Sequence, residues 1–325
     1  MATPKAIVGV LSIGQMGFGV AKLLLAHGFH VITNVGDRSF ATQERAKSAS
    51  IECASSDSEL VAKADYILSI VPPRDAKATA ERILNIFNHE VDPRTGKKEQ
   101  LYYADLNAVS PETARNISEL FQQEPRCKIR FIDGGIIGGP PSPTPDTGGW
   151  KRPGIPMSGP HPLSDAPIAG RELADTLNTR YLNADIGTAS GLKCTFAALS
   201  KGFTALALQS FTTAASLGVL PELQDYISEY NPSAKVRAEK GVTGCPPKAY
   251  RWVEEMNQIG QCFELEGGWP ASANVFRSVA SVYEQLAVTV EERGGAEGMD
   301  ELEGALSALT KSLKDGNDLP KIRID

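Results

Sequence analysis

The alternation of short apolar runs with helical segments in the first half of the chain is the feature that most narrows its fold. Runs typical of buried strands cover residues 6–11, 29–33, 51–53, 66–71, 101–106 and 128–132. Helical patterns lie over residues 16–27, 39–48, 58–64 and 75–87, and another helix begins at Ser110-Pro111-Glu112 with a hydroxyl cap, a proline and an acid. Strands that alternate with helices predict a parallel, doubly wound sheet of the α/β class.

The second half of the chain has a different pattern. From about residue 188 the strand signals stop, and helical patterns cover residues 191–217, 221–229, 247–264, 273–292 and 301–313. A chain of 325 residues is long enough for two domains. We therefore expect an α/β domain over residues 1–187 and an all-α domain over residues 188–325.

One segment between these regions is biased in composition. Residues Gly138 to Pro156 are rich in glycine and proline, which predicts a loop. Two interpretations stay open for this loop: a bare surface insertion, or a lid over a functional site.

The composition argues against several classes of protein. A formal net charge of −6 disfavours a nucleic acid or an anionic membrane as a partner, because both attract a basic face. We find no apolar run long enough to cross a bilayer and no secretory signal before the first strand, so we expect a cytoplasmic protein without a membrane partner. The five cysteines are scattered, as in a reducing compartment, and the four histidines form no ligand set, so no metal is expected.

A glycine-containing turn follows the first strand and opens the first helix. In dinucleotide-binding turns the glycines let the backbone approach the pyrophosphate, and the helix N-terminus supplies free N–H groups. Serine occupies the first glycine position here, but the order strand, turn, helix, strand favours a nucleotide site in a Rossmann domain over an ordinary turn. The expected cofactor contacts in this turn are Ser12, Ile13, Gly14, Gln15, Met16 and Gly17.

The end of the second strand indicates which dinucleotide binds. NAD enzymes usually place an acid there to hold the ribose 2′-hydroxyl, whereas this chain has Asn34. Arg38 and Ser39 follow, and a guanidinium matches the geometry of a 2′-phosphate. We therefore expect NADP, with Asn34, Arg38 and Ser39 as contacts. Asp37 leaves NAD as an alternative, because its carboxylate can hold the ribose. The simpler interpretation of Arg38 is a solvated residue at the start of a helix.

Two further strand ends belong to the expected site by topology, because ligands of such sheets bind at the carboxyl ends of the strands. The first is Val71-Pro72-Pro73, where the prolines also shape the turn. The second ends at Asn107, which can bond the nicotinamide ribose or merely cap the turn before Ser110.

Together these motifs resemble a known family. The glycine turn, the asparagine with Arg-Ser, the Val-Pro-Pro strand end, the run Asp133 to Gly139 and a lysine that opens a long helix resemble the β-hydroxyacid dehydrogenase and 6-phosphogluconate dehydrogenase superfamily. The resemblance is greatest to a branch with its own type of C-terminal helical domain. It implies a homodimer in which the helical domain binds substrate and closes the partner's cleft, and hydride transfer between the nicotinamide and an alcohol carbon.

Two family positions are only partly matched. In the family's substrate loop a serine and two glycines hold the substrate, and the corresponding residues here are Ile137, Gly138 and Gly139. In the family's catalytic segment a lysine is followed four residues later by asparagine, and here Lys193 is followed by Ala197. The resemblance therefore implies Lys193 as the catalytic residue and leaves recognition of a carboxylate in doubt.

A lysine can carry the proton transfer that hydride chemistry needs. The alcohol proton must leave during oxidation and return during reduction, and a lysine in a cleft can have a pKa lowered enough to exchange it. The residues after Lys193 are mostly apolar, so its alternative role is to extend its ammonium group to solvent.

Three residues of the helical half are further candidates for substrate binding. Lys201 lies about two turns after Lys193, although exposure to solvent is its simpler explanation. Trp252 and Glu255 share a helical face with Met256 and are candidates if this face meets the cleft. Core packing is the simpler interpretation of the face, above all for Met256.

Three functions follow from these residues. The first is an NADP-dependent oxidoreductase that acts on a small hydroxy compound or its carbonyl counterpart. The second is an imine reductase, since Asp-Gly-Gly-Ile-Ile-Gly-Gly-Pro resembles the strand end of those enzymes, although they tend to carry Asp or Tyr in place of the lysine. The third is a catalytically silent NADP-binding protein, because Ser12, Ile137 and Ala197 depart from the family pattern.

Overall fold

The computed structural model describes residues 3–36, 38–89, 93–94, 96–97, 99–145 and 148–317. The chain divides into two compact units, Met1–Cys194 and Thr195–Asp325, and the division falls within helix α7 (Thr188–Leu217). Each unit is described separately below. The expected domain boundary at residue 187 stays a prediction.

The first unit is built on a sheet of eight strands in the order β10-β9-β6-β5-β4-β1-β2-β3. Every pairing among β1 to β6 is parallel, whereas β9 pairs antiparallel with β6. This order confirms the predicted doubly wound, mostly parallel sheet. The strands are β1 (Ile7–Leu11), β2 (His30–Thr33), β3 (Glu52–Cys53), β4 (Tyr66–Ser69), β5 (Leu101–Asp105), β6 (Ile129–Gly134), β9 (Ile155–Ser158) and β10 (Thr179–Tyr181).

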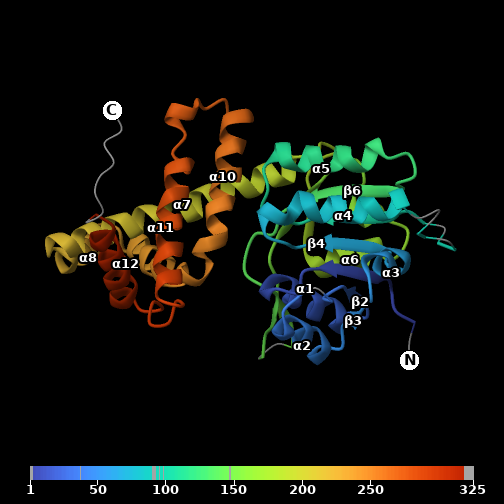
Figure 1. Cartoon of the computed structure of the whole chain (residues 1–325), viewed down its shortest axis with the longest axis horizontal. Coiled ribbons are helices and arrows are strands. Elements are labelled where there is room, and N and C mark those ends of the chain that lie inside the picture. Colours follow the sequence, from blue (N-terminus) through green and yellow to red (C-terminus); the bar gives the residue numbers. More distant parts are fainter. Residues whose placement is uncertain are drawn as a thin grey trace. The chain divides into compact units, whose positions relative to one another are not determined.

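Helices cover both faces of this sheet, because successive side chains of a strand point to opposite sides (Figure 1). Val8, Val10 and Leu68 pack in one core with helices α1 (Gln15–Ala26), α2 (Phe40–Ser48) and α6 (Gly170–Leu177). Leu11 and Ile67 pack in the other core with α3 (Asp57–Lys63), α4 (Ala76–His89) and α5 (Pro111–Gln123). The two cores hold the strand ends in fixed positions.

Local capping sets where two of these helices begin. Ser110 is the N-cap of α5 and its hydroxyl accepts the Thr113 N–H at 3.1 Å, with Pro111 as the first helical residue. Ser56 caps α3 in the same way through the Glu59 N–H. The predicted start at Ser110-Pro111 is therefore confirmed.

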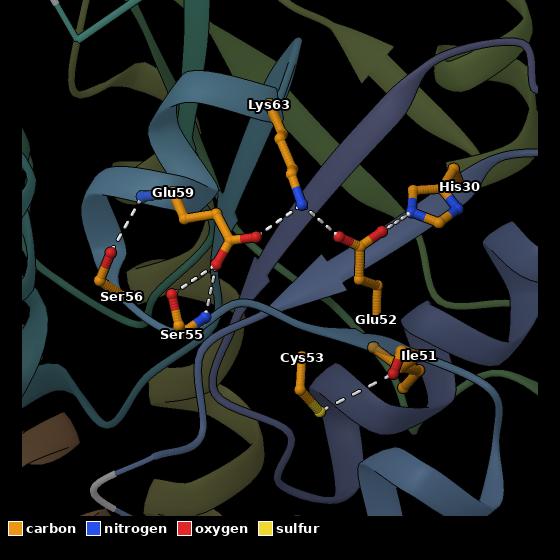
Figure 2. A network of polar contacts seen from close by, with 8 residues as sticks. All are labelled: His30, Ile51, Glu52, Cys53, Ser55, Ser56, Glu59 and Lys63. Atoms are coloured by element: carbon orange, nitrogen blue, oxygen red, sulfur yellow. Dashed lines mark hydrogen bonds and ion pairs between the residues drawn. The ribbon is translucent and has the colours of Figure 1, made fainter.

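An ion-pair network ties β2, β3 and α3 together (Figure 2). The Lys63 ammonium bonds Glu52 at 2.7 Å and Glu59 at 2.6 Å, and His30 Nε2 lies 2.5 Å from the other Glu52 oxygen. The Lys63 hydrogen bond, helped by His30, lowers the pKa of Glu52. His30 and Glu52 are the first residues of their strands, so this network lies at the opposite edge from the carboxyl ends.

The glycine-rich segment from Gly138 to Pro156 is not only a loop, and that expectation needs correction. Ser142–Pro143 (β7) and Trp150–Lys151 (β8) form an antiparallel pair, and β9 begins at Ile155. The segment is also anchored, because Pro140 and Pro141 approach Gly19 so closely that a Cβ there would meet them at 3.0–3.1 Å. Asp146 and Thr147 lie outside the described residues.

Helix α6 and strand β10 were not predicted. Ala169 and Asn178 flank α6 with φ angles of 52° and 57°. Glycine is the residue that usually adopts this left-handed conformation, and a glycine in the sequence would have indicated it. Neither residue is glycine, so the chain lacks the signal that would have marked the helix ends.

The second unit consists of helices. After the larger part of α7 come α8 (Leu220–Tyr230), α9 (Pro232–Gly244), α10 (Ala249–Leu265), α11 (Phe276–Glu292) and α12 (Leu302–Asn317). Helices α10 and α11 pack extensively on each other and bury Met256, Tyr283 and Leu286. The all-helical second region is confirmed, except that α9 was missed. Short 3-10 helices occur at Pro73–Asp75, Leu163–Asp165, Pro246–Lys248 and Ala271–Ala273.

No helix in the part of the chain that the structure describes combines the length and the apolar character that a membrane span requires.

Candidate functional site

The sheet order places several of the predicted residues along one edge. The strands β6, β5, β4 and β1 are neighbours and run parallel, so their carboxyl ends meet at the same edge. The turn after β1, Val71 after β4, Asn107 after β5 and the segment after β6 all begin there. This is the edge at which doubly wound sheets bind ligands.

The turn after β1 has the backbone of a dinucleotide-binding turn. Ser12 adopts a φ of 75°, the conformation that the first glycine of the fingerprint would supply. A Cβ at Gly17 would lie 2.0 Å from the Ser12 carbonyl oxygen, so only glycine fits there. A Cβ at Gly14 would meet only the Ser12 hydroxyl, at 3.8 Å, so the space above Gly14 is open.

The first turn of α1 suits an anion. Gly14 is its N-cap and brings no side-chain hydrogen bond, and the first turn carries no acidic residue. The first N–H groups of a helix lack partners within the helix and carry a partial positive charge. These groups and the open space above Gly14 fit a pyrophosphate. Of the other turn residues, Ile13 is buried, Met16 is half-buried and Gln15 is exposed.

At the end of β2, Asn34 is held by its neighbours. Its amide donates to Asp57 at 2.8 Å, and its oxygen accepts the Gly36 N–H at 3.2 Å. Arg38 and Ser39 are exposed, and Ser39 is the N-cap of α2. Asp37, the residue that favoured NAD, lies outside the described residues.

At the ends of β4 and β5, Asn107 joins the two strands. Its side-chain oxygen accepts the Val71 N–H at 2.7 Å, and its amide donates to the Ser69 hydroxyl at 3.0 Å. Asn107 is 2% exposed, so this residue shapes the turn. Pro72 precedes the 3-10 helix that starts at Pro73, which is consistent with the turn-shaping role expected for the prolines.

Asp105 is buried beneath this turn. One of its oxygens accepts the Asn107 main-chain N–H at 2.9 Å, and the other has no hydrogen-bond partner within the described residues. Burial raises the pKa of Asp105 to about 7. The neighbouring charge of Asp133 also raises this pKa, whereas the hydrogen bonds from Asn107 lower it. The carboxyl group is therefore partly protonated at neutral pH.

Asp133 at the end of β6 fixes the start of α7. This fully buried carboxylate accepts the N–H groups of Gly187, Ala189 and Ser190 at 2.9–3.2 Å. It also accepts the hydroxyls of Ser190 and Ser158. A carboxylate at a helix N-terminus is stabilised by the helix dipole, so Asp133 sets the position of every residue in the first turns of α7.

Lys193 projects from this anchored helix toward the segment after β6. Its ammonium donates to the Ile136 carbonyl at 2.5 Å, and its side chain is half-buried. A Cβ at Gly135 would lie 2.8 Å from the Lys193 Cβ, so this glycine makes room for the lysine. The structure therefore brings Lys193 together with the predicted substrate segment and does not extend it freely to solvent.

The predicted substrate segment itself is paired to the residue that precedes β9. Ile137 forms a bridge with Gly154, with hydrogen bonds of 2.8 and 2.9 Å in both directions. Gly138 has a φ of 127° and is exposed, as is Gly139. The two glycines are therefore accessible, whereas the main chain of Ile137 is engaged.

The other three candidates lie in the second unit. Lys201 forms an ion pair with Glu255, and its ammonium lies 4.9 Å from the centre of the Trp252 ring. The two charged side chains are 14% and 10% exposed, so the simpler expectation of a solvent-exposed Lys201 is wrong. Met256 is fully buried, as its core interpretation predicted. Tyr283 packs edge-on against Trp252 and completes this cluster.

Two polar contacts of this edge were missed by sequence reasoning. Asp133 matched a family position, but its role as the cap of α7 spans more than fifty residues. Arg45 of α2 donates to the Ile13 carbonyl in the glycine turn at 2.7 Å. No local pattern signals either contact, because both depend on the way distant segments pack.

Within the described residues no group of three or more His, Cys, Asp and Glu side chains is placed to hold a metal ion.

Comparisons with known proteins agree with this geometry. Residues 7–144 match the family described as the NAD binding domain of 6-phosphogluconate dehydrogenase, and residues 214–286 match a domain of unknown function, DUF1932. Residues 7–144 therefore form an NAD-binding domain of the 6-phosphogluconate dehydrogenase type. Such a domain is typical of NAD(P)-dependent dehydrogenases and reductases.

Individual relatives are distant. An uncharacterised 28.5 kDa protein of Methanothermus fervidus is 26% identical over 231 residues, 67% of this chain and 77% of that one. The Mycobacterium tuberculosis 3-hydroxyisobutyrate dehydrogenase with L-serine is 15% identical, with a TM-score of 0.62 over 95% of this chain and 99% of that one. An imine reductase of Myxococcus stipitatus in complex with NADP+ is 19% identical, with a TM-score of 0.51 over 93% and 99%. These two structures share the fold.

Proposed function

We propose that this protein is an NADP-dependent oxidoreductase that transfers a hydride between the nicotinamide and a small hydroxy compound or its carbonyl counterpart. The observation that carries the proposal is the position of Lys193. Its ammonium lies against Ile136, in the segment that follows β6, at the edge where the glycine turn offers an anion site. A cofactor site and a proton-transferring group therefore occur along one edge of one sheet.

The choice of NADP over NAD rests on the residues after β2. Asn34 is committed to Asp57, and Arg38 and Ser39 lie exposed at the start of α2, where a 2′-phosphate would meet a guanidinium and a helix N-terminus. A fluorescence titration with NADPH and with NADH tests this choice. We expect micromolar affinity for NADPH, weakened at least tenfold by Arg38→Ala. Equal or better binding of NADH would contradict it.

Lys193 is proposed as the general acid and base. NADP would supply or accept the hydride when bound, while the Lys193 ammonium would give its proton to the substrate oxygen in reduction and the neutral Lys193 amine would take a proton back in oxidation. Gly138 and Gly139 offer exposed main-chain groups to the substrate nearby. We expect Lys193→Ala to leave NADPH affinity unchanged and to lower turnover at least a hundredfold, the low end for this type of catalysis. Unchanged turnover would remove Lys193 from the mechanism.

Imine reduction is the second candidate. It is favoured by Ile137 and Ala197, which replace the family's serine and asparagine, and by the shared fold of the imine reductase. A substrate screen with NADPH separates the candidates: turnover of a cyclic imine and of no hydroxy acid, aldehyde or ketone would favour the imine. Tight NADPH binding without any turnover would instead favour a silent binding protein.

We also propose that the protein is a homodimer. Helix α8 has no buried residue, and its Tyr226 and Tyr230 are 64% and 75% exposed. On α7, Leu199 and Leu206 are 75% and 63% exposed. Apolar surface on several helices of one unit marks an interaction site, and the dimer implied by the superfamily resemblance is the partner we expect. A mass by light scattering near twice the 34.8 kDa of one chain tests this.

A further inference from the structure

The serine at the first position of the glycine turn has an energetic consequence. A residue other than glycine with a φ near 75° is strained and keeps that conformation only where its surroundings enforce it. In the usual fingerprint a glycine adopts this conformation without strain. The Ser12 turn therefore needs external support that a glycine turn does not.

Two contacts supply this support. On one side the Ser12 carbonyl packs against Gly17, where a Cβ would lie 2.0 Å from it. On the other side Arg45 donates to the carbonyl of the next residue, Ile13, at 2.7 Å. The Ile13 carbonyl belongs to the peptide that joins Ile13 to Gly14, so Arg45 fixes the plane in which the Gly14 N–H points.

Arg45 also lies on α2, the helix whose start we propose as the binding site of the 2′-phosphate. Helix α2 begins after Ser39, next to Arg38, and Arg45 is in its last turn. One short helix thus carries the residues proposed for the 2′-phosphate at its start and the support of the pyrophosphate turn at its end. Arg45 therefore adds a polar link between α2 and the turn to the core that Ala46 and Ile13 share.

We propose that Arg45 is a positioning residue that holds the Ser12 turn in its pyrophosphate-binding conformation and couples it to α2. This inference rests on the proposed NADP site. It predicts that the importance of Arg45 depends on the strain at Ser12. Removal of the guanidinium lets the serine turn relax, whereas a glycine at position 12 keeps the same conformation unaided.

A double-mutant cycle tests this dependence, with NADPH affinity measured by fluorescence. We expect Arg45→Met to weaken NADPH binding about tenfold in the parent chain, and less than about threefold when Ser12→Gly is also present. Ser12→Ala keeps the strain and removes the hydroxyl, so in that background Arg45→Met should again cost about tenfold. Lys47→Met is the matched control, since it removes an exposed cation from the same helix turn and should change little.

Amide hydrogen exchange without cofactor gives a second readout. Arg45→Met and Arg45→Gln should both speed exchange of the Phe18 N–H, which donates to the Gly14 carbonyl of the turn at 2.8 Å, about tenfold, and Lys47→Met should not. An equal loss of NADPH affinity in the serine and glycine backgrounds would overturn the proposal, because Arg45 would then act on the cofactor directly. Unchanged affinity and exchange would overturn it as well. Failure of the parent chain to bind either nucleotide would instead reject the proposed function, while exchange would still report on Arg45.

Discussion

At the scale of single residues, Gly14 and Gly17 of the same turn have different roles. Gly17 is required by the fold, because a Cβ there would lie 2.0 Å from the Ser12 carbonyl. Gly14 is not required by the fold, because the space beside it is open. The space at Gly14 is where a pyrophosphate would approach the backbone.

Alanine substitutions at these glycines should therefore affect different properties, NADPH affinity at Gly14 and stability at Gly17. We expect Gly14→Ala to keep the melting temperature within a few degrees and to weaken NADPH binding at least tenfold, because the methyl group occupies the phosphate space. Gly17→Ala should destabilise the protein by about 1–3 kcal/mol or more, as overpacking does. Thermal melts and NADPH titrations of both variants check this. A Gly14→Ala protein that binds normally would show that the phosphates lie elsewhere.

Asp105 should make stability depend on pH. Its pKa is about 7 in the folded protein, against an ordinary value of 3.8. As pH rises above 4 the unfolded chain loses this proton while the folded protein keeps it up to about pH 7. The free energy of unfolding therefore falls across pH 4–7, by about 1.4 kcal/mol for each pKa unit between the two states, and stays lower above pH 7.

Asp105→Asn removes this titration and retains an oxygen for the Asn107 N–H. We expect the variant to melt at a higher temperature than the parent at pH 8, and to show no such gain at pH 4.5. Asp225→Asn, on an exposed side chain, is the control and should change neither value. A gain of the same size at both pH values would mean that the charge of Asp105 is not the cause.

At the scale of elements, the site depends on how α7 is anchored. Asp133 accepts three main-chain N–H groups at the start of this helix, so its loss leaves several buried donors without partners. Asp133→Ala should cost about 3 kcal/mol or more, whereas Ser110→Ala, which removes an ordinary N-cap from α5, should cost about 1 kcal/mol. Urea unfolding of the two variants compares them. Equal losses would show that the Asp133 contacts are no stronger than a single cap.

The elements also show what sequence can and cannot predict. Strand periodicity and the cap at Ser110-Pro111 located most of the first unit, and the topology rule indicated which strand ends meet at one edge as a candidate site. The same kind of signal, Asn231-Pro232, marks the start of α9 and was overlooked. Helix α6 had no such signal, because its left-handed ends are Ala169 and Asn178. Contacts such as Arg45 with Ile13 depend on packing between distant elements, which local patterns do not encode.

At the scale of the whole molecule, the residues proposed for cofactor binding and those proposed for association belong to different units. The residues proposed to bind NADP all belong to Met1–Cys194, whereas α8 and most of α7, which carry the exposed apolar side chains, belong to Thr195–Asp325. A dimer in which one helical domain closes the partner's cleft would affect turnover without affecting the primary cofactor contacts. Disruption of the dimer should therefore separate the two properties.

Leu206→Glu tests this separation, because Leu206 is 63% exposed and its substitution adds a charge to the apolar face without changing the core. We expect the variant to be monomeric by light scattering, to bind NADPH within about threefold of the parent, and to lose at least tenfold in turnover. Gln209→Glu, an exposed polar position one turn further along α7, is the control and should stay dimeric. A monomer with full turnover would show that each chain closes its own site, and the helical unit would then serve substrate binding without a partner.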